Sequence, residues 1–152
     1  MIDIKGSEFG SAGALSNFCA YPFIFDGILC AGAEGPIQSF KFDDPKLQCE
    51  ICGLVGRKAK SRGRERDDAW KKVQKLWWQG EEYDRHSEEY QHLLDRLFDA
   101  LSGNTDFQVA LLASGNEELT HSIGSSDPRE TVLTEQEFCS RLMRLRHCLA
   151  FC

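Results

Sequence analysis

Apolar residues recur every three or four positions after Ser87, which is the spacing of one buried helix face. The residues of this stripe are Tyr90, Leu93, Leu94, Leu97, Phe98 and Leu101. Ser87 suits the N-cap position, and Gly103 supplies a stop after the last apolar residue. The pattern therefore predicts a helix over residues 88–102.

A terminal helix is predicted after Thr134, because Glu137 three residues later completes a capping box. The residues that would face the core are Phe138, Leu142, Leu145 and Leu149. Helical spacing also predicts three shorter helices, over residues 36–42, 47–59 and 70–80.

Residues 1–33 are instead rich in glycine, aromatic and β-branched residues. Two short apolar runs flank Asp26-Gly27, a dipeptide that favours a tight hairpin turn. No internal repeat, low-complexity segment or linker divides the chain. We expect the α+β class: one predominantly helical domain over residues 1–152, with a small N-terminal antiparallel sheet.

The composition is that of a globular protein, with 41% hydrophobic and 28% charged residues. No apolar run reaches the ~18–20 residues that a membrane-spanning helix needs. The N-terminus also lacks the basic start and apolar segment of a secretory signal. We therefore expect a cytoplasmic protein with no membrane partner.

The chain has seven cysteines, and an odd number without a signal favours reduced thiols over disulfides. Cys49 and Cys52 have the spacing of a metal or redox pair, but no second Cys or Cys/His pair completes a zinc site. We expect packed free thiols, no bound metal and no cofactor.

The net charge of −6 gives the surface as a whole no electrostatic attraction for nucleic acid. Residues 57–66 depart from that average, with six basic residues and one acidic residue. The run is either a solvated helix end or a patch that faces phosphate groups, for which clustered guanidinium groups are suited.

The predicted helix near Pro36 carries the most informative polar residues. Glu34, Gln38 and Lys41 are spaced i, i+4 and i+7, so they share one helix face. The helix N-terminus favours the ionised form of Glu34. The set is either a catalytic constellation or an ordinary surface ion pair, which stabilises a helix by only ~0.2–0.5 kcal/mol.

Five blocks of sequence point to a family. They are Leu15-Ser16-Asn17-Phe18, the Pro22-Phe23…Asp26-Gly27 turn, Glu34 with Gln38 and Lys41-Phe42, the segment 111–119, and Leu142-Met143 with Leu145-Arg146. In this order and spacing, over roughly residues 13–149, the chain resembles the NADAR (YbiA-like) family. Members of that family cleave bonds between ribose C1 and a nitrogen.

The resemblance implies three catalytic residues. The family's motif glutamate falls on Glu34, its lysine on Lys41 and its late aspartate on Asp127, with one residue inserted after His121. Asp127 before Pro128 is also an ordinary N-cap arrangement. The Trp-Gly-rich segment that commonly follows the family's aspartate is absent here, where the chain instead reads Asp127-Pro128-Arg129-Glu130.

The expected substrate-binding residues are Asn17, Gln38, Trp70, Trp78 and His121. Trp70 corresponds to the family's tryptophan and either stacks on the base or packs in the core. Asn17 either binds a ribose hydroxyl or closes a turn. His121 either lines the pocket or is a structural histidine.

The expected activity is hydrolysis of a ribose C1–N bond in a phosphorylated nucleotide-like substrate. The resemblance implies a riboflavin-biosynthesis intermediate or ADP-ribosylated guanine, the latter also within nucleic acid. A carboxylate opposes the positive charge of the oxocarbenium-like transition state, and a proton donor helps the base depart. A desolvated lysine can instead attack C1 and form a Schiff base. The alternative is a non-catalytic module that binds ADP-ribose or an NAD derivative.

Overall fold

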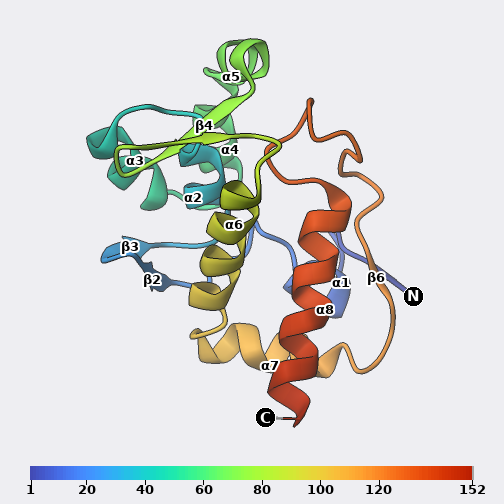
Figure 1. Ribbon diagram of the computed structural model, residues 1–152. Helices are drawn as coiled ribbons and strands as arrows, with labels where there is room; N and C mark the ends of the chain where they lie inside the picture. The colour runs from blue at the N-terminus through green and yellow to red at the C-terminus, as the bar shows by residue number, and fades with distance from the viewer. Residues whose placement is uncertain (152) are drawn as a thin grey trace.

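The computed structural model describes residues 1–151, which form helices and three small two-stranded sheets, with the β2–β3 hairpin at one edge of the molecule (Figure 1). The helices are α1 (Ser11–Ala14), α2 (Glu34–Ser39), α3 (Pro45–Cys52), α4 (Arg57–Arg64), α5 (Asp67–Val73), α6 (Glu88–Leu101), α7 (Thr105–Ala113) and α8 (Glu135–Phe151). The strands are β1 (Ile2–Asp3), β2 (Phe23–Phe25), β3 (Ile28–Cys30), β4 (Lys75–Trp78), β5 (Glu81–Asp84) and β6 (Leu119–Thr120). This mixture confirms the predicted α+β class, with one hydrophobic cluster at the centre.

The two long helices form as the sequence predicts. The Ser87 hydroxyl accepts a hydrogen bond from the Tyr90 N–H at 3.2 Å and caps α6. At the start of α8 the Glu137 N–H donates to the Thr134 hydroxyl at 3.1 Å, and the Thr134 N–H donates back to the Glu137 carboxylate at 2.8 Å. This is the predicted capping box. The predicted apolar stripe of α6 is buried throughout.

The predicted hairpin is present as β2 and β3, which pair in an antiparallel register. Asp26 and Gly27 have φ values of 48° and 81°, as a two-residue turn with left-handed backbone requires. Phe23 and Phe25 point into the core. The prediction of an antiparallel sheet near the N-terminus is therefore confirmed.

Two further sheets lie outside that prediction. The segment 70–80 is not a helix throughout: α5 ends where Gln74 adopts a left-handed φ of 54°, and β4 then pairs with β5. Leu76 and Trp78 are buried, and Trp77 between them is only half-buried, as strand alternation requires. Near the chain ends, β1 pairs with β6 in parallel.

The predicted helix over 47–59 is also two helices, α3 and α4. Gly53 and Gly56 interrupt it, and Gly56 has a positive φ of 56° that a helix does not allow. The break lets α4 turn back against α2. This packing brings the basic helix next to the helix that carries Glu34.

Six described cysteines have free thiols, and Cys30, Cys52 and Cys139 among them are buried; Cys152 lies outside the described residues. Within residues 1–151 no helix combines the length and apolar character needed to cross a membrane.

Candidate active site

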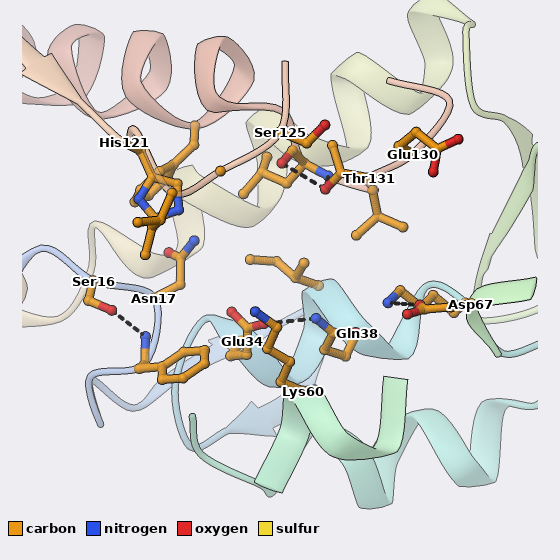
Figure 2. Close-up of a pocket in the computed structure, with 18 of the residues that line it drawn as sticks. Ser16, Asn17, Glu34, Gln38, Lys60, Asp67, His121, Ser125, Glu130 and Thr131 are labelled. Atoms are coloured by element: carbon orange, nitrogen blue, oxygen red, sulfur yellow. Dashed lines mark hydrogen bonds and ion pairs between the residues drawn. The ribbon is translucent and has the colours of Figure 1, made fainter. Parts of the chain in front are cut away.

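A cavity of about 340 Å³ lies between α2 and the loop that joins β6 to α8. Figure 2 shows Glu34, Gln38 and Lys60 on one side and His121, Ser125 and Thr131 on the other. Its volume is near the lower end of the range for small-molecule sites. Six of the eight residues predicted from sequence line it: Asn17, Glu34, Gln38, Lys41, Trp70 and His121.

Helix α2 forms the floor of the cavity, and all six of its residues are buried. Two glycines let neighbouring helices approach it closely. A Cβ on Gly35 would lie 2.7 Å from the Ile51 carbonyl of α3. A Cβ on Gly63 of α4 would lie 1.7 Å from the Gln38 carboxamide oxygen. The floor is therefore held from both sides by close contacts that a larger side chain would disturb.

Gln38 orients the carboxylate one helical turn before it. Its Nε2 donates a hydrogen bond to Glu34 Oε1 at 2.8 Å, as the i, i+4 spacing predicts. Gln38 Oε1 is buried without a hydrogen-bond partner among the described residues. Gln38 thus presents its amide to Glu34, and its oxygen packs against Gly63 of α4.

Glu34 is only 8% exposed, and burial raises its pKa above the ordinary value of 4.5. The hydrogen bond from Gln38 and the charges of Lys60, Lys41 and His121 oppose that rise. The sequence indicated that the helix N-terminus would favour the ionised form. Desolvation of the carboxylate outweighs these favourable interactions, so the pKa of Glu34 rises overall despite its position at the helix N-terminus.

Lys41 follows the last turn of α2, and its ammonium group pairs with Asp67 Oδ1 at 2.5 Å. Burial lowers the pKa of Lys41, while the hydrogen bond and charge of Asp67 act in the opposite direction. Asp67 is the first residue of α5 and lines the same cavity. Sequence analysis missed it, although its position directly after the basic run was a usable signal.

Three other predicted residues border the cavity. Trp70 is 1% exposed, so its ring is mostly part of the core, and only part of its surface is available to a ligand. The backbone carbonyl of Asn17 accepts a hydrogen bond from the Glu34 N–H at 3.2 Å, which fixes Asn17 beside the start of α2. His121 bonds through Nδ1 to the Ile4 carbonyl at 2.8 Å.

Two predicted residues lie outside the cavity. Trp78 is buried in β4, where its ring stacks on Phe25 at 4.9 Å and its Nε1 donates to Asp26 at 2.8 Å. Its placement as a stacking residue was wrong because strand alternation directs it into the core. Asp127 is exposed, and its Oδ1 accepts the Arg129 N–H at 2.9 Å. Asp127 therefore caps a backbone N–H, which is the role of an N-cap residue, and does not reach the cavity.

The roof of the cavity has no helix or strand and is held by buried side chains. Arg85 is 1% exposed; its Nε donates to the Thr131 carbonyl at 2.9 Å, and its two terminal nitrogens bind Glu137 at 2.7 and 3.1 Å. The Tyr90 hydroxyl donates to the Val132 carbonyl. Sequence patterns did not reveal this network, because its partners lie more than 40 residues apart.

The basic run forms α4, and one of its lysines reaches the cavity. Lys60 is exposed, lines the cavity and lies 5.8 Å from the centre of the Phe18 ring. Arg66, at the end of the run, donates from Nε to the Lys41 carbonyl at 3.3 Å. The run therefore combines a structural contact with a cation at the cavity.

No cluster of three or more His, Cys, Asp or Glu side chains with metal-binding geometry occurs in the described part of the chain. The lining instead contains separate carboxylates, amines and an imidazole, from residues Glu34, Lys41, Lys60, Asp67, His121 and Glu130. These groups can exchange protons and stabilise charge on a polar substrate.

The solved structure of the Escherichia coli protein YbiA, determined by NMR, has the same fold. Its TM-score is 0.59 with 23% sequence identity, and the match covers 99% of this chain and 87% of YbiA. The resemblance to NADAR proteins seen in the sequence is thus confirmed at the level of the fold.

A phage protein is more similar in sequence. An uncharacterised 17.1 kDa protein from the Gp30–rIII intergenic region of Enterobacteria phage T4 is 38% identical over 138 residues, or 90% of each chain. The sequence family described as bacteriophage protein GP30.3 matches residues 10–147. This chain therefore belongs to the family of bacteriophage protein GP30.3.

Proposed function

We propose that the protein is an N-glycosidase that hydrolyses the bond between ribose C1 and a nitrogen base. One observation carries the proposal: Glu34 and Lys41, seven residues apart, are both buried and both line one cavity. Two ionisable groups with oppositely displaced pKa values are typical of acid–base sites. The YbiA-like fold is consistent with this chemistry.

Glu34 is proposed to stabilise positive charge on the sugar. Cleavage of a glycosyl bond gives the ring oxocarbenium character, and an adjacent carboxylate opposes that charge. In a site with little water this interaction is stronger than at the protein surface. The hydrogen bond from Gln38 holds the carboxylate in one orientation and so limits reorganisation during the reaction.

Lys41 is proposed to act as the nucleophile. Its lowered pKa increases the fraction of uncharged amine, which can form a Schiff base with C1 of the opened ribose. Asp67, in contact with the lysine Nζ, is placed to hold the proton that the amine loses. Together the pair provides both the attacking atom and its base.

The substrate is proposed to carry a phosphate. Lys60 places an exposed ammonium group at the cavity, and the other basic residues of α4 surround it along the chain. A cation of this kind binds a phosphate oxygen as a point charge. Both substrate classes implied by the family resemblance, phosphorylated riboflavin precursors and ADP-ribosylated guanine, satisfy this requirement.

The experiment is an assay of the purified protein with both substrate classes, following release of the free base by chromatography. We expect turnover on one class and a loss of at least about 100-fold in kcat for Glu34→Gln, the usual scale for a charge-stabilising group. A matched control is Glu50→Gln, an exposed change on α3. Equal rates for wild type and Glu34→Gln on both classes would refute the proposal.

A second candidate is a module that binds an ADP-ribose-like nucleotide without cleaving it. The exposed position of Asp127 favours it, because the cavity then lacks one predicted catalytic acid. Titration calorimetry with ADP-ribose would show binding with no product in the recovered sample. Absence of binding to ADP-ribose would dismiss this candidate.

A further inference from the structure

His121 is the one imidazole among the residues that line the cavity, and it lies on the roof, across from the floor helix that carries Glu34 (Figure 2). The other acidic groups of the lining are already engaged. Asp67 pairs with Lys41, and the exposed Glu130 pairs with Lys71 at 3.4 Å. His121 on the roof is therefore the remaining candidate for the group that donates a proton to the departing base.

The histidine ring is held in one orientation. Its Nδ1 lies 2.8 Å from the Ile4 carbonyl, and because a carbonyl oxygen only accepts, Nδ1 must carry the hydrogen. The ring also packs edge-to-face on Phe138, with centroids 5.4 Å apart. Nε2 is left as the nitrogen that can gain or lose a proton.

Gly124 lies close to the edge of the ring that carries Nε2. A Cβ on Gly124 would lie 2.6 Å from His121 Cδ2 and 3.3 Å from Nε2, so a larger residue would cover this edge. Two carboxylates fix the surrounding chain. The His121 N–H donates to Glu135 at 3.0 Å, and the Ser122 N–H donates to Asp3 at 2.8 Å. The imidazole is thus anchored through Nδ1, and His121 lines the cavity.

We propose that His121 is the general acid that protonates the departing base, an inference that rests on the proposed function. The C1–N bond breaks, its electron pair stays on the base, and the base takes the proton from His121 Nε2. C1 bonds to the uncharged Lys41 amine, and a proton of the resulting ammonium passes to Asp67, which contacts Lys41 Nζ, and then to the ring oxygen as the ring opens. Water hydrolyses the resulting protonated imine, which frees the sugar and the uncharged amine and releases one proton that restores His121.

The test is the dependence of the rate on the leaving group. His121→Asn keeps an N–H donor near the position of Nδ1 for the Ile4 carbonyl but removes Nε2. The substrates are a ribosyl pyrimidine 5-phosphate, whose base needs protonation, and 4-nitrophenyl ribofuranoside 5-phosphate, whose nitrophenolate leaves without it. His92→Asn, an exposed change on α6, is the matched control.

We expect His121→Asn to reduce kcat on the pyrimidine substrate by about 10²–10⁴-fold, the usual contribution of a general acid. On the nitrophenyl substrate the loss should be less than about tenfold, whereas Glu34→Gln should be slow on both. A structural role for His121 would reduce both rates equally, and that result, or no change on either substrate, would overturn the proposal. If the wild type turns over ADP-ribosylated guanine and not the pyrimidine, that substrate takes the place of the pyrimidine in the comparison. A wild-type protein inactive on both substrate classes would remove the proposed function itself, which is a different outcome.

Discussion

Replacing Gly63 with alanine adds one methyl group at the contact between α4 and α2. In a helix this change normally stabilises by about 0.5–1 kcal/mol, because alanine restricts the unfolded chain. Here the new Cβ would lie 1.7 Å from Gln38 Oε1, 2.6 Å from Cδ and 3.0 Å from Cβ. All three atoms belong to the side chain that orients Glu34, so that side chain must move.

The expected free-energy change follows from three contributions. Overpacking a filled contact costs about 1–3 kcal/mol, and losing the Gln38–Glu34 hydrogen bond costs about 0.5–1.5 kcal/mol. The gain in helix propensity returns about 1 kcal/mol. Gly63→Ala should therefore destabilise by about 0.5–3.5 kcal/mol, which lowers Tm by roughly 1–14 °C in a domain of this size. Activity should fall as well, because Glu34 loses its fixed orientation.

The assay is urea unfolding of Gly63→Ala, Gln38→Ala and the double variant, with Gly53→Ala as the matched control. Gly53 has ordinary backbone angles (φ −78°, ψ −3°), and an added Cβ would come no closer than 3.4 Å to its neighbours. The double variant should be more stable than the sum of the single changes predicts, because Gln38→Ala removes the clash. Strict additivity, or a Gly63→Ala protein as stable as wild type, would refute this reasoning.

The remaining predictions concern charge, covalent chemistry and the roof. Because burial raises the pKa of Glu34, the stability that this group gives the wild type falls as pH rises above 4.5 through the raised pKa. The Glu34→Gln protein should therefore gain stability relative to wild type over that pH range. A constant difference between the two proteins in urea unfolding from pH 4 to 8 would contradict this. If the Lys41 amine attacks C1, sodium borohydride added during turnover should leave a ribosyl adduct detectable by mass spectrometry, and unmodified protein with undiminished turnover would exclude the Schiff base. Tyr90→Phe should lower the unfolding free energy by about 1–3 kcal/mol, because it leaves the buried Val132 carbonyl without its partner; an unchanged urea midpoint would show that the roof does not depend on this bond.

The caps and stripes of α6 and α8 were predictable because their signals are local. Ser87, Thr134 and Glu137 act on backbone groups within three residues, so the sequence alone specifies the bonds. The hairpin at Asp26-Gly27 was predictable for the same reason. Helix α2 was predictable too, and with it the shared face of Glu34 and Gln38, but it spans Glu34–Ser39 instead of 36–42, so Lys41 lies beyond its end.

The errors have physical causes that lie outside the local sequence. Three consecutive apolar residues, 76–78, fit both a helix and a strand, and pairing with β5 decides between them. Trp78 then points into the core rather than the site. Asp127 was placed by family resemblance, but the irregular roof makes local spacing a poor guide to position. Asp67 and Arg85 act through partners 26 and 46 or more residues away, which no periodicity detects.

Helix α2 has six residues, too few to persist as a helix by itself in water. The helices that pack against α2 therefore stabilise its helical conformation. As a result, the floor of the cavity forms only together with the core. Amide protons of α2 should exchange with solvent only when the entire molecule opens, at the same free energy as the slowest amides of α6. A partly unfolded form that keeps the core would therefore keep the floor of the cavity as well.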